Sequence, residues 1–251
     1  MDRDERNRLI CKQLSADYCF DPDEFKSGSG HVFSLYEPLA GRRVFDPHED
    51  VFLKVVSYKN RLLFTGKKEI ITECEKRYKD VDAAWFMEPK PLRSLNDLLY
   101  GYGYRIEKMH PFYTSFEPRE VKADAYEIRY FETEEIEQFR GDDRFEKAYS
   151  FLEAAPDVVG VGAYKDGKIL GMAGASADSP LFWQIGIDVV PEARGQGIGV
   201  ILVSLLRNEI LKRGRVPYYG TAVSHTLSQN IAIRSGFTVA FTELITSKVS
   251  E

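Results

Sequence analysis

Residues 185–213, IGIDVVPEARGQGIGVILVSLLRNEILKR, decide the fold of this chain. The stretch opens with β-branched residues and reaches Pro191, which cannot continue a hydrogen-bonded strand ladder. Apolar side chains then recur at helical spacing from Ile198 to Ile210, and Gly214 follows shortly after them. The stretch therefore predicts a strand, a glycine-rich loop and an amphipathic helix.

The loop between this strand and helix, residues 194–199, reads RGQGIG. A glycine loop that leads into a helix presents backbone N–H groups without helical partners and the positive end of the helix dipole, which together favour phosphate oxygens. Gly197 and Gly199 allow the backbone to approach an anion closely, and Arg194 adds a cation beside it. The sequence therefore predicts a phosphate-binding loop, without identifying the phosphate.

Spacing excludes two familiar phosphate-binding loops. A P-loop needs a lysine and a serine or threonine directly after its last glycine, whereas Val200 and Ile201 follow Gly199. A dinucleotide fingerprint needs G-x-G-x-x-G, whereas Gly195, Gly197 and Gly199 form G-x-G-x-G. Rossmann-type dinucleotide binding is therefore not expected.

The pattern that does match is R-x-x-G-x-G, formed by Arg194, Gly197 and Gly199 after V-x-P-E at residues 189–192. It resembles the acyl-CoA-binding motif of the GNAT superfamily of N-acyltransferases. Residues 225–237, HTLSQNIAIRSGF, are similar to a second GNAT signature, N-x-x-S-x-x-v-A-x-k-x-G-F. The resemblance implies an α/β fold with a mixed sheet, the GNAT fold, and direct transfer of an acetyl group from acetyl-CoA to an amine in a ternary complex.

The same resemblance implies which residues bind CoA. The loop amides would hold the pyrophosphate, and the preceding strand would hold the pantetheine arm, with the N–H of Val189 polarising the thioester carbonyl. Ser228 keeps the serine of the second signature, but His225 stands where the family usually has asparagine. The residues predicted to bind acetyl-CoA are Ile187, Val189, Arg194, Gly195, Gln196, Gly197, Ile198, Gly199, His225 and Ser228.

The catalytic base is predicted from the chemistry of the reaction. The attacking amine must be neutral, so a base must take its proton, directly or through water. The candidates, in order, are Asp188, His225 and Glu153. Each has a structural alternative, because Asp188 could pair with a neighbour, His225 could mark a helix entry, and Glu153 could be a solvated surface residue.

The acid that protonates the departing thiolate is harder to predict. Many GNAT relatives carry a tyrosine on the last helix for this step, but residues 231–235 contain none. Tyr218, or its neighbour Tyr219, could supply a phenol instead, although tyrosines in strands often serve packing. The missing helix tyrosine leaves an alternative function open, that of a non-catalytic acyl-CoA-binding or scaffolding module.

Composition sets the remaining expectations. The chain has 251 residues and a formal net charge of −5, which argues against nucleic-acid binding and suits a cationic amine. No window approaches the ~18 apolar residues of a spanning helix. Three scattered cysteines without a C-x-x-C pair indicate reduced thiols and no metal site. We therefore expect a cytoplasmic protein, monomer or homodimer, that does not bind membranes and takes a small-molecule or peptide amine as acceptor.

Two domains are predicted, residues 1–120 and residues 121–251, joined by a charged segment that contains Pro118. The first has elements in the order strand, helix, strand, helix, strand, which resembles the second half of the GNAT fold. It is interpreted as a degenerate GNAT-like domain or as an unrelated α+β domain. Its single glycine before a helix, Gly66, has no R-x-x-G-x-G around it.

The sequence also predicts five local features. Hairpin turns are expected at residues 59–60 and at Asp166-Gly167. A strand is expected at residues 83–87 and a helix at residues 144–154. Small residues in the strand that follows the second hairpin, residues 169–175, predict close packing by a ligand or by another backbone.

Overall fold

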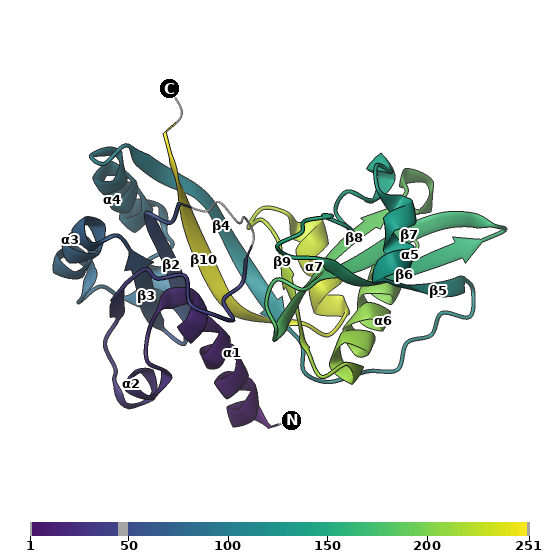
Figure 1. The fold of residues 1–251 in the computed structure, drawn as a ribbon, viewed down its shortest axis with the longest axis horizontal. Helices are drawn as coiled ribbons and strands as arrows, with labels where there is room; N and C mark the ends of the chain where they lie inside the picture. The colour runs from purple at the N-terminus through teal and green to yellow at the C-terminus, as the bar shows by residue number, and fades with distance from the viewer. Residues whose placement is uncertain (1, 45–49, 250–251) are drawn as a thin grey trace. The chain divides into compact units, whose positions relative to one another are not determined.

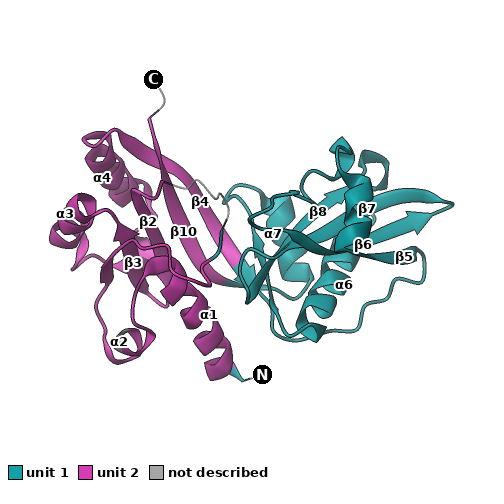
Figure 2. Cartoon of the chain, viewed as in Figure 1, with its two compact units in different colours: residues 1–2, 43–47, 113–239 teal, residues 3–42, 48–112, 240–251 magenta. Residues whose placement is uncertain are grey.

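A computed structural model describes residues 2–44 and 50–249 of the chain (Figure 1). The chain forms two compact units, each assembled from segments that are not contiguous in sequence (Figure 2). Unit 1 contains residues 1–2, 43–47 and 113–239, and unit 2 contains residues 3–42, 48–112 and 240–251. Both combine helices with strands, so the predicted α/β class is confirmed. The predicted division into domains at residue 120 stays a prediction.

Unit 2 is a sheet covered by helices. Its strands follow the order β1 (Val32–Leu35), β3 (Arg61–Gly66), β2 (Leu53–Tyr58), β10 (Thr238–Lys248) and β4 (Tyr104–Thr114). Its helices are α1 (Arg3–Tyr18), α2 (Pro22–Ser27), α3 (Lys68–Tyr78) and α4 (Pro89–Tyr100). The β1–β3 pair is parallel, and β2 is antiparallel to both β3 and β10. The apolar stripe of α3, including Ile70 and Cys74, packs with Phe64 and Leu95 in the core.

The strand predicted at residues 83–87 is wrong. Ala83–Trp85 form a 3-10 turn, η1, in which the N–H of Ala84 donates to the side chain of Asp82 at 2.9 Å. The capped turn buries Phe86 in the core of unit 2, so this apolar run packs without joining a sheet.

Both predicted hairpin turns are confirmed. Lys59 and Asn60 have φ values of 48° and 56° between β2 and β3, and Asp166 and Gly167 have φ values of 51° and 75°. Two successive residues in the left-handed region match the right-handed twist of the flanking strands, which explains why these two-residue turns close hairpins.

Unit 1 is a sheet with the strand order β9 (Val216–Gly220), β8 (Phe182–Val189), β7 (Lys168–Ser176), β6 (Asp157–Lys165) and β5 (Glu127–Glu132). Neighbours from β5 to β8 are antiparallel, and β8 is parallel to β9. The predicted amphipathic helix, α6 (Ile198–Lys212), packs across β6, β7 and β8, and α7 (Thr226–Arg234) packs against α6. The fully buried Leu202 and Leu206 are part of the core beneath α6.

A segment with little regular structure separates β5 from β6. After α5 (Thr133–Ile136) and the 3-10 turns η2 (Glu137–Phe139) and η3 (Asp143–Phe145), the chain runs irregularly to β6. The helix predicted at residues 144–154 is therefore wrong. Side-chain carboxylates take the N–H groups that a helix would need: Asp188 binds those of Lys147 and Ala148, and Asp157 binds that of Phe151 at 2.7 Å.

Three glycines make room for this segment. Gly160, Gly174 and Gly186 lie opposite one another in the registers of β6, β7 and β8 and form a glycine row. A Cβ atom at any of them would overlap residues 147–149: the Tyr149 hydroxyl at Gly160, the Ala148 carbonyl at Gly174 and the Lys147 carbonyl at Gly186. The small residues predicted to accept a ligand or another backbone therefore accept a backbone here.

Candidate functional site

The loop that begins α6 has the backbone shape that its glycines predict. Gly195 and Gly197 have φ values of 79° and 80°, in the left-handed region that favours glycine. The helix's first bonds run from the N–H groups of Val200 and Ile201 to the Gly197 carbonyl, at 3.0 and 3.1 Å. The preceding N–H groups have no carbonyl of their own helix to bind, so they lie at the positive end of the dipole and can bind an anion.

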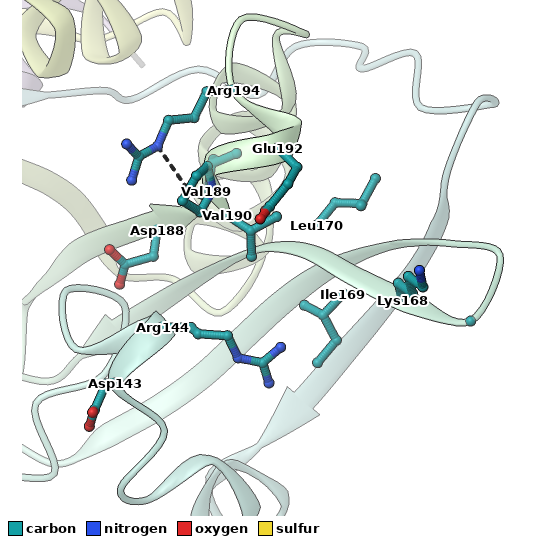
Figure 3. A pocket seen from close by; sticks show the side chains of 12 residues that line it. Asp143, Arg144, Lys168, Ile169, Leu170, Asp188, Val189, Val190, Glu192 and Arg194 are labelled. Atoms are coloured by element: carbon teal, nitrogen blue, oxygen red, sulfur yellow. Dashed lines mark hydrogen bonds between the residues drawn. The ribbon is translucent and has the colours of Figure 1, made fainter.

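Arg194 stands between this loop and the end of β8. Its Nε donates to the carbonyl of Val189 at 3.2 Å, shown as a dashed line in Figure 3. The side chain is exposed to solvent. The bond therefore holds a guanidinium group beside the loop, where its other N–H groups can bind a phosphate.

The strand that leads into the loop leaves its parallel neighbour early. The ladder between β8 and β9 consists of the pairs Phe182–Val216, Trp183–Pro217 and Gln184–Tyr218. Strand β8 then continues to Val189 while pairing with β7 on its other side. Residues 185–189 of β8, which include the predicted CoA contacts Ile187 and Val189, thus extend beyond the part paired to β9.

An open pocket of about 1050 Å³ lies at the end of β8 (Figure 3). Its wall comes from η3, the start of β7, the end of β8 and the residues before the glycine loop. It is lined by side chains of both charges, namely Asp143, Arg144, Lys168, Asp188, Glu192 and Arg194, and by the apolar Ile169, Leu170, Val189, Val190 and Pro191. The pocket therefore joins the predicted phosphate loop to the first candidate base, Asp188.

Asp188 has hydrogen-bond partners within the protein, as expected if its role is structural. Its Oδ2 accepts the N–H groups of Lys147 at 2.7 Å and Ala148 at 2.9 Å, which fixes the irregular segment over β8. Burial raises the pKa of this carboxyl group, while the two amides act in the opposite direction. The group is half-buried and also lines the pocket, so a structural role and a role as base are compatible.

The other two candidate bases are exposed. His225 is the N-cap residue of α7, and its side chain makes no capping hydrogen bond. Its carbonyl accepts the N–H of Gln229 at 3.1 Å, which is the helix-entry role anticipated for it. Glu153 lies in an exposed turn before β6. Neither residue lines the pocket at the end of β8.

The two adjacent tyrosines of β9 point to different partners. The hydroxyl of Tyr219 lies 2.8 Å from Oγ of Ser228 on α7, and burial raises the pKa of this phenol. Tyr218 is fully buried and donates to the carboxylate of Asp178, and its hydroxyl lies 3.0 Å from Oε1 of Gln184. No pattern in the sequence links Asp178 and Gln184, since the first lies in a loop and the second in a strand.

Across residues 2–44 and 50–249, no group of three or more histidine, cysteine, aspartate or glutamate side chains could hold a metal ion. In the same part of the chain, no helix has both the length and the apolar character needed to cross a membrane.

The fold and the loop define a structural class: an α/β domain in which a glycine loop leads from a central strand into the N-terminus of a helix. Residues 122–237 match the family model described as the acetyltransferase (GNAT) family. The matched residues include the glycine loop and α7, and the match confirms the resemblance seen in the sequence.

Solved structures of GNAT proteins are similar to the chain at low identity. An acetyltransferase from the GNAT family of Colwellia psychrerythraea is 14% identical, with a TM-score of 0.46 over 99% of this chain and 98% of that one. A GCN5-related N-acetyltransferase-like protein from Streptococcus suis is 15% identical, with a TM-score of 0.46 over 83% and 89%. A putative acetyltransferase from Novosphingobium aromaticivorans is 18% identical, with a TM-score of 0.44 over 59% and 69%. No curated protein matches the chain.

Proposed function

We propose that the protein is an N-acetyltransferase that transfers the acetyl group of acetyl-CoA to the amine of a small molecule or peptide, by direct attack in a ternary complex. The observation that carries this proposal is the open glycine loop at the start of α6, with Arg194 beside it, inside the region that matches the GNAT family. Acetyl-CoA supplies an activated acyl group as a thioester when it is bound.

The geometry of the loop fits the pyrophosphate of CoA. Among the described residues, no atom lies within 4 Å of a Cβ position built at Gly195 or Gly197, so the backbone there can be approached closely. The N–H groups of residues 195–199 and the guanidinium of Arg194 would bind the pyrophosphate oxygens. Gln196 and Ile198 would contribute their backbone N–H groups to this set.

The pantetheine arm is proposed to follow β8 where this strand extends beyond its ladder with β9. A peptide-like arm needs backbone hydrogen-bonding groups, and a strand edge presents N–H and C=O groups at regular spacing. Ile187 and Val189 would supply these groups, and the N–H of Val189 would polarise the thioester carbonyl, an effect worth about 3 kcal/mol in comparable oxyanion sites. His225 and Ser228 would contact the arm from the start of α7.

Proton transfer is proposed to use groups on both sides of β8. Asp188 would take the proton of the attacking amine, directly or through water, because it lines the pocket and burial raises its pKa toward the working range. Tyr219, held by Ser228, is the better-placed phenol for the departing thiolate. Tyr218, the phenol favoured from the sequence, is bound to Asp178 and Gln184 and is the second candidate acid. His225 is a candidate proton shuttle.

The experiment that tests this function has two stages. The first is calorimetric titration with acetyl-CoA, CoA, NAD and ATP, in which only the first two are expected to bind. The second measures release of free CoA thiol from acetyl-CoA in the presence of a panel of amines. Binding without transfer to any amine would favour the alternative, an acyl-CoA-binding module, which the absence of tyrosine from residues 231–235 also favours. No response to acetyl-CoA or CoA would overturn both.

A further inference from the structure

A buried lysine in unit 2 has no acceptor for its hydrogen bonds. Lys54, on β2, is only 8% exposed. Its Nζ lies 5.0 Å from the centre of the Tyr36 ring and 5.5 Å from the centre of the Tyr18 ring. Within the described residues, the Lys54 side chain makes neither an ion pair nor a hydrogen bond. Lysine is rarely buried without such a partner, so the arrangement is unusual for a folded protein.

The two aromatic rings do not replace the missing acceptor. A ring face attracts a cation, but the ammonium group carries three N–H groups that are best satisfied by oxygen acceptors. The hydroxyl of Tyr18 donates to Oε1 of Glu243, at 3.0 Å. A buried cation without hydrogen bonds lowers the stability of the fold. An oxygen acceptor from outside the chain would remove this cost.

A second donor without a partner lies beside Lys54. Thr65, on β3, is opposite Lys54 in the antiparallel ladder, so both side chains lie on the same face of the sheet (Figure 1). Thr65 is fully buried, and its Oγ1 has no hydrogen-bond partner in the part of the chain that the structure describes. Directly opposite residues have Cβ atoms about 5 Å apart. Because the stem of lysine is flexible, its ammonium group and the threonine hydroxyl can reach one ligand.

A neighbouring hydroxyl on the same face is bonded normally. Ser34, on β1, is opposite Thr65 in the parallel register. Its Oγ donates to the carbonyl of Tyr18, the last residue of α1, at 2.5 Å, and lies 3.2 Å from the carbonyl of Phe64. The protein thus supplies acceptors to the hydroxyl at this end of the row, whereas it supplies none to Thr65 or Lys54.

The ammonium group is the accessible end of this pair of donors. Thr65 Oγ1 is among the unpartnered atoms that are sealed from solvent in residues 2–44 and 50–249, and Lys54 Nζ is not. The exposed part of Lys54 therefore includes its ammonium group. A ligand can enter at Lys54 and reach Thr65 behind it.

The charges around Lys54 favour a monoanion. Lys54 supplies one positive charge. Glu243, on β10, is opposite Val56 in the ladder, two residues from Lys54, so its carboxyl group shares this face and is only 4% exposed. A dianion such as phosphate would bring excess negative charge beside this buried carboxyl group. A monocarboxylate balances the charge of lysine, and its two oxygens match the two donors.

We propose that Lys54 and Thr65 form a binding site in unit 2 for a small monocarboxylate. One carboxylate oxygen accepts from the Lys54 ammonium group, and the other accepts from the Thr65 hydroxyl. The inference goes beyond the proposed function and does not rest on it, since neither residue belongs to the proposed acetyl-CoA site.

The first test follows the Lys54 side chain by NMR in the full chain. Lysine is labelled with ¹³C at its ε carbon, and Lys54→Met assigns the Lys54 signal. Titration with acetate at constant ionic strength is expected to shift this signal to saturation, and phosphate at pH 8 is expected to bind at least tenfold more weakly. A signal that does not saturate with acetate, or equal affinity for phosphate, would overturn the inference.

Variants test the two donors by calorimetric titration with acetate. Lys54→Met should lose measurable binding, and Thr65→Val, which keeps the shape of the side chain, should raise the Kd about tenfold. Lys67→Met is the matched control, since Lys67 is a lysine of the same unit whose Nζ lies 2.9 Å from a carboxylate oxygen of Asp50, and it should keep the wild-type affinity. Wild-type affinity in Lys54→Met or in Thr65→Val contradicts the proposed site.

Thermal unfolding distinguishes a lost ligand contact from a lost fold. Lys54→Met removes a buried charge that has no partner, so without carboxylate its melting temperature should exceed that of the wild type. Acetate should raise the melting temperature of the wild type alone and narrow the gap, because a ligand stabilises only the protein that binds it. A lower melting temperature of Lys54→Met without carboxylate would mean that the protein itself satisfies Lys54, and the inference would fail.

Discussion

Two helices of the chain begin directly after a strand and a glycine: α3 follows Gly66, and α6 follows the loop at residues 194–197. At the first, a Cβ on Gly66 would overlap the carbonyl oxygen of Phe52 on the neighbouring chain segment. The same oxygen accepts the N–H of Lys67 at 3.0 Å. The glycine before α3 is therefore needed for close packing. The N–H of Lys67, at the start of α3, is already bound by the carbonyl of Phe52 and is not available to a ligand.

The loop before α6 is built in the opposite way. Gly195 and Gly197 are left-handed, and no described atom lies within 4 Å of the Cβ position of either. The glycines are needed for backbone shape and not for packing, so they leave the helix start accessible. The comparison shows that a glycine before a helix does not by itself indicate an anion site; left-handed glycines beside open space and a cation such as Arg194 do.

The largest expected effect comes from filling the open loop. Gly197→Leu should weaken CoA binding about a thousandfold, or about 4 kcal/mol, because two charge-assisted bonds of about 2 kcal/mol each are lost. Calorimetric titration with CoA measures this directly. Gly214→Leu is the matched control, since Gly214 is also left-handed, at φ 72°, with no described atom within 4 Å of its Cβ position. Equal loss of affinity in both variants would remove the loop from the site.

A side chain added at Gly66, the closely packed glycine, should lower stability and leave CoA affinity unchanged. Gly66→Ala is expected to lower the free energy of unfolding by about 3 kcal/mol, because the added methyl overlaps backbone that cannot rotate away. Denaturant titration measures the loss, and the CoA affinity of the folded variant should be unchanged. A variant as stable as the wild type would contradict the distinction drawn between the two helix starts.

Removing the charge of Arg194, the cation beside the open loop, should have a smaller effect on CoA affinity. Arg194→Gln should lower CoA affinity about tenfold, equivalent to about 1.4 kcal/mol, since one charge-assisted contact is lost while the loop amides remain. The difference from wild type should shrink as salt rises, because exposed charges are screened. Arg140→Gln, at an exposed arginine paired with Glu137, is the control and should leave affinity unchanged at every salt concentration.

The smallest expected effect is on stability and concerns the glycine row of unit 1. Tyr149→Phe should raise the free energy of unfolding by about 1 kcal/mol, because the hydroxyl is buried against Gly160 without a hydrogen-bond partner among the described residues. Thermal and denaturant unfolding measure the gain. A loss of stability instead would mean that the Tyr149 hydroxyl has a hydrogen-bond partner in solution, such as a water molecule beside the glycine row.

The sequence predicts those elements that depend on periodicity and turn chemistry. The strand, loop and helix of residues 185–213 lie where the pattern places them, as do the hairpins at residues 59–60 and 166–167. In these segments local preference and tertiary packing agree. The loop's role in binding CoA stays a prediction, as do the roles of Asp188 and His225.

The two wrong predictions have different causes. At residues 83–87 the adjacent Asp82 caps a 3-10 turn that buries Phe86, whereas at residues 144–154 distant side chains bind the backbone N–H groups. Asp188, about 40 positions away in sequence, binds the amides of Lys147 and Ala148, and no local pattern reports such a bond. The cluster of Asp178 and Tyr218 was missed for the same reason, because it forms only when β8 and β9 come together.

The glycine row also has a consequence for solvent access. Residues 147–149 belong to no helix or strand, and segments of this kind usually exchange their amide hydrogens quickly. Here two of these amides are bound to a half-buried carboxylate and lie against three strands with no side chains between them. The amide hydrogens of Lys147 and Ala148 are therefore expected to exchange as slowly as those of the strands beneath them.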